Sequence, residues 1–168
     1  MPRLQVAILS LEPAWLLPND QIQRAQQMFA PHGINIDVLY QSSAGPGGRF
    51  NNPPRVRWCV NDDLTTDQQR LSQLRHQDPQ VVTVFTTQTM SPPDFGCAAH
   101  APEAPMAVVA STATIWTVAH ELGHLLGLGH VTTPDSLMLR STKKLSASPL
   151  PGLSPAEIAT VQSSPLLI

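Results

Sequence analysis

Three of the chain's six histidines lie within residues 120–130, and their spacing constrains the fold more than any other feature of the sequence. His120 and His124 are four residues apart, so on an α-helix they project from one face, one turn apart. His130 cannot join them if the helix continues, because ten residues at about 1.5 Å each would carry it roughly 15 Å along the axis. The helix must therefore end, and the chain must double back, before His130.

Gly127 lies where that break is required. Glycine adopts the left-handed conformation at a helix end without a steric penalty, and Gly129 adds conformational freedom two residues later. We predict a helix over residues 115–126 that ends at Gly127, followed by a turn that brings His130 back to the two helical histidines. The sequence thus contains three candidate ligands and also the helix end that allows them to meet.

Three neutral imidazoles suit zinc, which binds histidine nitrogen at about 2.0–2.1 Å. Three protein ligands leave one tetrahedral position for water, as in catalytic sites, whereas structural sites are closed by four protein ligands. Zinc lowers the pKa of a bound water, and a neighbouring carboxylate can take the proton. Glu121 adjoins His120 and is placed to contact that water. We expect one zinc ion held by His120, His124 and His130, with Glu121 as the general base.

Other interpretations of these histidines are weaker but open. A core helix with satisfied histidines is improbable, because the extended pattern fixes five positions and arises by chance in such a chain on the order of once in 100,000. A second alternative is a zinc-stabilised peptide-binding or effector module with little or no proteolysis. A third is a zinc hydrolase that acts on another amide or an ester.

The composition indicates one globular domain. A chain of 168 residues supports one hydrophobic core, and its 42% apolar and 13% charged residues argue against disorder. A net charge of −2 gives no electrostatic case for binding nucleic acid or an anionic membrane. No apolar run approaches the roughly 18 residues of a membrane span. Nothing indicates an oligomer, so we expect a monomer.

Two questions stay open in the sequence. The first nine residues resemble a strand more than a secretory signal, which leaves an intracellular protein and a mature secreted form as alternatives. The two cysteines, Cys59 and Cys97, could be free buried thiols or one disulfide with similar probability.

Hydrophobic periodicity predicts an α+β fold. We expect strands at residues 3–11, 34–40, 56–60, 81–85, 96–101 and 106–110, and helices at 19–30, 67–77, 115–126 and from Ser154. Ser154 and Glu157 have the spacing of a capping box, with Pro155 at the first helical position. We predict one domain over residues 1–168. Its N-terminal subdomain, residues 1–127, would contain a twisted mixed sheet with helices on one face and the active-site helix. Its small C-terminal subdomain, residues 128–168, would end in a helix.

The run from His120 to His130 resembles the zinc-binding motif of the metzincin clan of metallopeptidases. Met138, eight residues past His130, resembles the methionine of their methionine turn, which packs beneath the zinc without binding it. Within the clan, the helix motif, residues 135–138 and residues 153–158 are most similar to the matrixins. This resemblance implies a zincin-type fold and a zinc endopeptidase that cleaves peptide or protein substrates in an extended conformation.

The resemblance also bears on substrate binding. Residues 96–101 are similar to the matrixin edge strand, so an extended substrate is expected to pair with this strand or with its neighbour at 106–110. Residues 131–151 are expected to form the lower wall of the cleft and much of the specificity pocket. The candidate substrate-contacting residues are Ala98, Ala99, His100, Val108 and Val109.

Several matrixin features are not found. Leu139 follows the methionine where matrixins have tyrosine, and the one tyrosine, Tyr40, lies far away in the sequence. His100 matches one ligand of their structural zinc, but no His-x-Asp pair precedes it. The sequence contains no recognisable acidic calcium loop and no propeptide cysteine motif. We therefore expect a single zinc and no calcium.

Overall fold

The computed structural model describes residues 1–11, 19–43, 55, 64–91, 95–99 and 105–168. Its centre is a five-stranded sheet with the strand order β2-β1-β3-β5-β4. Four strands are parallel, and β4 alone is antiparallel to its neighbour β5. The strands are β1 (Arg3–Ser10), β2 (Asn35–Ser43), β3 (Val82–Thr87), β4 (Gly96–Ala99) and β5 (Met106–Ala110). This confirms the predicted α+β fold with a mixed sheet.

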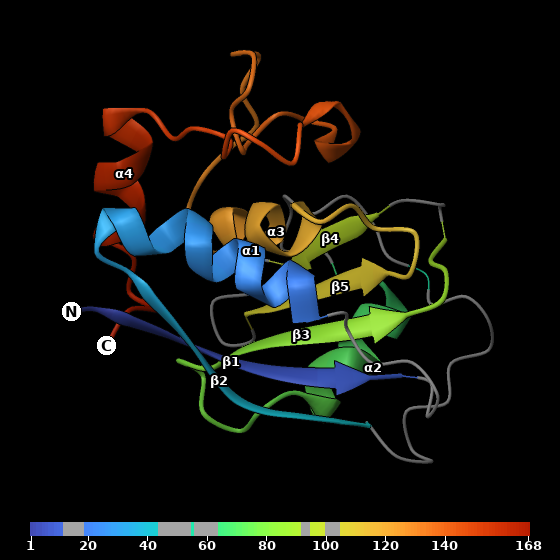
Figure 1. The fold of residues 1–168 in the computed structure, drawn as a ribbon. Coiled ribbons are helices and arrows are strands. Elements are labelled where there is room, and N and C mark those ends of the chain that lie inside the picture. The colour runs from blue at the N-terminus through green and yellow to red at the C-terminus, as the bar shows by residue number, and fades with distance from the viewer. Residues whose placement is uncertain (12–18, 44–54, 56–63, 92–94, 100–104) are drawn as a thin grey trace.

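The helices occupy both faces of the sheet and the C-terminal end of the chain (Figure 1). The α-helices are α1 (Asn19–Phe29), α2 (Thr66–Leu74), α3 (Thr117–Leu125) and α4 (Pro155–Gln162), and the short 3-10 helices are η1 (Ala30–His32) and η3 (Thr142–Lys144). The chain from η3 to α4 forms a layer on the far side of α1 and α3 from the sheet (Figure 1).

The prediction that the helices share one face of the sheet is wrong. Val82 and Val84 of β3 pack in the core that includes α1 and α3, whereas Phe85 packs in a second core with Leu71 of α2. Every residue of β3 and β5 is buried, so both faces of the sheet require a cover. The nearly continuous apolar run at 81–85, interrupted only by Thr83, is the sequence signal for such a doubly covered strand.

The predicted boundaries differ from the observed ones at a few ends. β2 continues to Ser43 although its last residues are exposed, because its backbone pairs with β1 as far as Ser10. The helix predicted to reach residue 77 ends at Leu74. Residues 100–101 of the predicted edge strand and the strand predicted at 56–60 lie outside the described residues.

The C-terminal end of the chain is fastened to the first strand. The backbones of Arg3 and Ile168 exchange two hydrogen bonds of 2.9 and 3.0 Å. Before them, α4 begins with the predicted capping box, in which Ser154 N–H donates to Glu157 Oε2 at 2.7 Å and Glu157 N–H donates to Ser154 Oγ at 3.3 Å. None of the helices in the described ranges is long and apolar enough to span a bilayer.

Candidate metal centre

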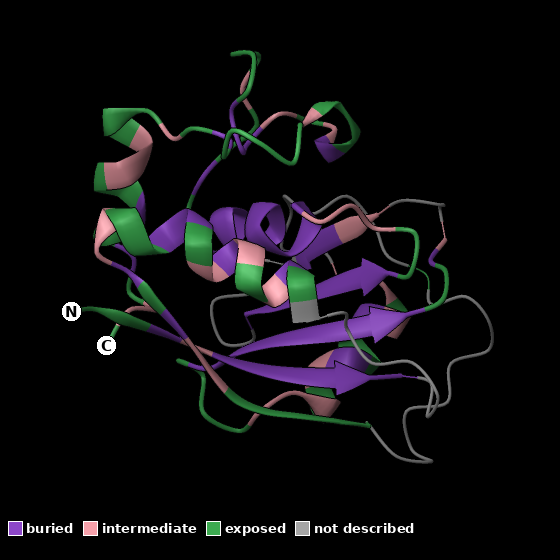
Figure 2. Cartoon of the chain, in the orientation of Figure 1, coloured by how far each residue is buried: buried purple, intermediate pink, exposed green. Residues whose placement is uncertain are grey.

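The centre of the molecule is helix α3, all of whose residues are buried (Figure 2). Most of them are apolar or small, but His120, Glu121 and His124 are only 4–6% exposed. Burying ionisable side chains costs free energy unless partners compensate for the lost water. The contacts of these three side chains therefore indicate which ligand the site can bind.

The helix ends where Gly127 was predicted to end it. Gly127 has a φ of 104°, in the region that favours glycine. Its N–H donates to the carbonyl oxygen of His124 at 2.9 Å, and the N–H of Leu128 donates to that of Gly123 at 2.9 Å. These two bonds form a Schellman motif, which satisfies the last carbonyls and reverses the chain. The reversal brings His130 back beside His120 and His124, as predicted.

The three histidines point their Nε2 atoms at one another. The separations are 3.1 Å between His124 and His120, 3.1 Å between His124 and His130, and 3.2 Å between His120 and His130. Nitrogens this close together can all bind one ion at about 2.0–2.1 Å, the usual distance from zinc to imidazole nitrogen. His120 and His124 are buried and His130 is exposed, so the site is buried on the side of the helix and open to solvent on the side of His130.

The second ring nitrogens show which atoms are available for a metal. Nδ1 of His120 lies 2.8 Å from the carbonyl oxygen of Leu137, and Nδ1 of His124 lies 2.8 Å from that of Leu128. A carbonyl oxygen can only accept a hydrogen bond, so both Nδ1 atoms carry the proton and both neutral rings present a bare Nε2 lone pair. Two lone pairs 3.1 Å apart repel each other, and a shared cation removes that repulsion. The donor set therefore fits a zinc ion.

Met138 forms the apolar floor of the site. Met138 and Leu137 are fully buried, and a β-carbon added to Gly123 of α3 would lie 2.7 Å from the Met138 sulfur. The methionine thus packs directly against the helix between the two histidine turns. Its neighbour Leu137 supplies the carbonyl oxygen that orients His120. The methionine turn predicted from the resemblance is therefore coupled to a metal ligand through the backbone.

Glu121 lies against the edge strand β4. A β-carbon added to Gly96 would lie 2.5 Å from Oε1 and 2.8 Å from Cγ of Glu121. The absent side chain of Gly96 therefore leaves the space in which the carboxylate sits, beside the histidines of the same helix. Gly96 belongs to the strand segment that the resemblance singled out, but its packing role requires a tertiary contact and was not predicted.

The fold and the donor set agree with a comparison of the sequence with protein families. Residues 42–163, most of the chain, match the matrixin family. The chain belongs to the matrixin family. It is a metallopeptidase domain with the zinc-binding histidine triad of His120, His124 and His130. No curated protein sequence matches this matrixin significantly.

Several solved structures have a similar fold and a distant sequence. Metalloproteinase-II from Bacteroides fragilis is 18% identical with a TM-score of 0.65, and the match covers 96% of this chain and 52% of that one. A zinc-dependent peptidase from Methanocorpusculum labreanum is 15% identical with a TM-score of 0.58, covering 93% and 99%. Archaemetzincin from Methanopyrus kandleri is 13% identical with a TM-score of 0.56, covering 95% and 94%. This matrixin spans about half the length of the Bacteroides protein, and these likenesses concern the fold alone.

The structure separates the predicted substrate-contacting residues into two groups. β5, with Val108 and Val109, pairs with β3 on one side and β4 on the other, so no backbone edge is free for a substrate there. The expectation that a substrate pairs with β5 is corrected accordingly. β4, with Ala98 and Ala99, is the edge strand, and His100 lies outside the described residues.

The structure describes the bonding of Cys97 and the position of Tyr40. Cys97 of β4 is disulfide-bonded, and the chain's other cysteine, Cys59, lies outside the described residues. Tyr40 lies on β2, at the opposite edge of the sheet from β4. The one tyrosine of the chain is therefore remote from the histidine site.

Proposed function

We propose that this matrixin is a zinc endopeptidase that cleaves extended peptide chains, with Glu121 as the general base. The observation that carries the proposal is the convergence of three histidine Nε2 atoms, 3.1–3.2 Å apart, two of them from the helix that also carries the buried Glu121. Three ligands leave an open coordination position, which suits hydrolysis better than a purely structural role.

The metal ligands are oriented by backbone groups. His120, His124 and His130 would hold the ion, and the carbonyl oxygens of Leu128 and Leu137 keep two of the rings in the required tautomer. Zinc bound there would polarise the scissile carbonyl and make water a stronger acid.

The Glu121 carboxylate takes a proton from the attacking water and delivers it to the leaving amine nitrogen. The carboxylate is buried between α3 and β4, next to a ligand of the same helix, which suits this task. The substrate backbone would pair with the free edge of β4, which carries Ala98 and Ala99.

The test compares the wild type with Glu121→Gln on a diverse peptide library, with zinc content measured on both proteins. We expect chelator-sensitive cleavage by the wild type, and a loss of at least about a thousandfold in kcat/KM for the variant with zinc retained. Glutamine preserves the shape of the side chain but cannot accept the proton. Equal cleavage by the two proteins would refute the role of Glu121.

The same experiment addresses the alternative of a zinc-stabilised peptide-binding module. That alternative predicts stoichiometric zinc in both proteins and no turnover of any peptide by either. A third outcome, hydrolysis of small esters or amides without cleavage of extended chains, would favour a non-peptidase zinc hydrolase.

A further inference from the structure

We propose that this matrixin selects substrates that carry an acidic side chain on one side of the scissile bond, the side that faces Phe95. The selecting element is the basic segment, defined as Arg140, Lys143 and Lys144. The inference rests on the proposed function and names the substrate class of that same site.

The path of the substrate past the basic segment follows from the position of β4. A peptide paired with the free edge of this strand passes Gly96, against which the Glu121 carboxylate packs. The residue before Gly96 is Phe95, and the ammonium group of Lys143 lies 4.4 Å from the centre of the Phe95 ring. A side chain on this end of the bound peptide therefore approaches Lys143 just beyond the reacting bond.

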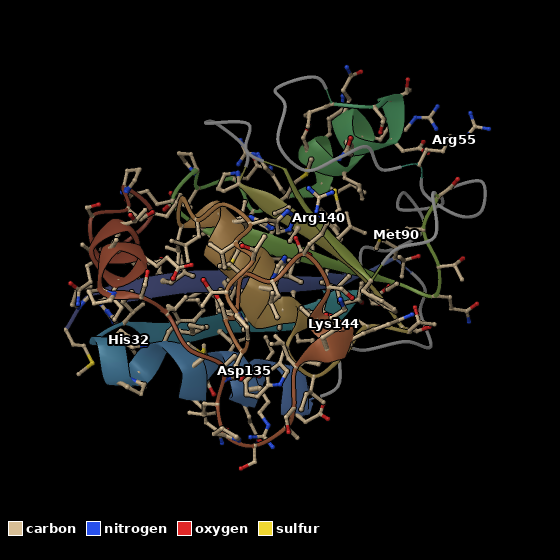
Figure 3. The ribbon with its side chains drawn as sticks, turned by 90° about the horizontal axis from the view of Figure 1, so that it is seen from above. His32, Arg55, Met90, Asp135, Arg140 and Lys144 are labelled. Atoms are coloured by element: carbon tan, nitrogen blue, oxygen red, sulfur yellow. The ribbon has the colours of Figure 1, made fainter. Side chains whose placement is uncertain are left out.

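The basic segment carries three positive charges, and none of them forms an ion pair within the part of the chain that the structure describes. Arg140, Lys143 and Lys144 are exposed, and Arg140 and Lys144 are labelled in Figure 3. The sequence has no acidic residue from Ser136 to Ala156. Both ion pairs found in the described residues lie elsewhere, at Arg3–Asp37 and Arg70–Asp67. A cationic surface beside the bound peptide favours carboxylate side chains and disfavours lysine and arginine.

The segment is held in place from the start of helix α3. Thr142, which is buried, lies between Arg140 and Lys143, and its Oγ1 lies 3.3 Å from that of Thr117. The indole N–H of the fully buried Trp116 donates to the carbonyl oxygen of Ser146 at 2.8 Å. Since α3 also carries His120 and His124, these contacts fix the backbone of the basic segment relative to two of the metal ligands. The backbone needs little ordering when a substrate binds, which increases the selectivity of a charge contact.

The test uses peptides in which each position on either side of the scissile bond is Glu, Gln or Lys. For the wild type we expect Glu to raise kcat/KM about two- to fivefold over Gln, the size of a solvent-exposed ion pair, at one or two adjacent positions on one side only. Lys at those positions should lower it, and 0.5 M salt should remove most of the difference.

Lys143→Glu puts an acidic side chain beside the Phe95 ring and lowers the formal charge of the basic segment from +3 to +1, so it should remove most of the preference for Glu over Lys at the same positions. Arg70→Glu makes the same change of charge on α2, on the opposite face of the sheet, and should keep the wild-type preference. Zinc content measured on each variant shows that the site is intact.

The outcomes distinguish the two proposals. Cleavage of all peptides with equal kcat/KM for Glu, Gln and Lys overturns the acidic preference and leaves the endopeptidase in place. A preference of undiminished size in Lys143→Glu overturns the role of the basic segment. No cleavage of any peptide, with zinc bound, overturns the proposed function and this inference with it.

Discussion

The Glu121 carboxylate occupies the space in which a β-carbon of residue 96 would stand. The distance from that β-carbon position to Oε1 is 2.5 Å, closer than real contacts allow, and Thr117 Cγ2 would be 2.7 Å away. Glycine at the start of β4 is thus the condition for placing Glu121, the proposed general base, against the edge strand. The contact ties the predicted base to the predicted substrate strand.

Gly96→Ala should therefore impair catalysis while leaving the metal site intact. The added methyl must displace the carboxylate or the strand, and a shift of about 1 Å at a reacting group can cost on the order of a hundredfold in rate. We expect a fall in kcat/KM of about ten- to a hundredfold with zinc content unchanged. Gly129→Ala is the matched control, because a β-carbon there meets nothing within 4 Å. Wild-type kinetics for Gly96→Ala would contradict this placement of Glu121.

Gly123→Ala tests the packing of Met138 against helix α3. The test depends on whether the variant raises or lowers the free energy of unfolding. Alanine in a helix is intrinsically better than glycine by about 0.8–1 kcal/mol, so propensity alone predicts stabilisation. The added β-carbon would, however, lie 2.7 Å from the Met138 sulfur in a fully buried region. Overpacking typically costs about 1–3 kcal/mol, so we expect net destabilisation in urea unfolding with zinc present.

Met138→Ala distinguishes a clash from a general weakening of α3. Combined with Gly123→Ala, it removes the sulfur that the new methyl meets, so the two changes should destabilise by less than the sum of their separate effects. Strict additivity would mean that Met138 does not limit the space beside Gly123.

Gly127→Ala should weaken zinc binding more than Gly129→Ala does. A φ of 104° is strained for alanine, and the new β-carbon would lie 3.3 Å from Thr160 Cγ2 of α4. Strain of this kind costs on the order of 1–3 kcal/mol. Relief of that strain would move the Leu128 carbonyl away from His124 and His130 away from the other ligands. Competition with a chromophoric chelator should show an affinity lower by about ten- to a hundredfold, and equal affinities for the two variants would contradict the role of Gly127.

The histidine site could be predicted from the sequence because its determinants are local. The helical spacing of His120 and His124 and the break at Gly127 act within a few residues, so the convergence of the three ligands followed from helix geometry alone. The capping box of α4 is local in the same sense. Such features depend little on how distant segments pack.

The parts that were missed depend on tertiary contacts or on the backbone. The carbonyl groups of Leu128 and Leu137, which orient the histidines, leave no trace in side-chain identity. The interior position of β5 follows from strand order, and its apolar sequence is equally compatible with an edge. The place of α2 on the second face depends on Leu71 meeting Phe85, two residues that local periodicity does not relate.

Removal of zinc should destabilise the domain, because the ligands join helix α3 to the turn that follows it. Without a cation, the bare nitrogens of His120 and His124 face each other at 3.1 Å. Zinc at about a thousand times its dissociation constant contributes about 4 kcal/mol to the free energy of unfolding. We expect a chelator to lower Tm by several degrees and added zinc to restore it. His130→Ala should abolish most of this response, whereas His32→Ala, which changes a histidine on η1, should preserve it. A Tm that is insensitive to chelator in the wild type, with zinc removal verified, would show that the metal does not hold the helix and the turn together.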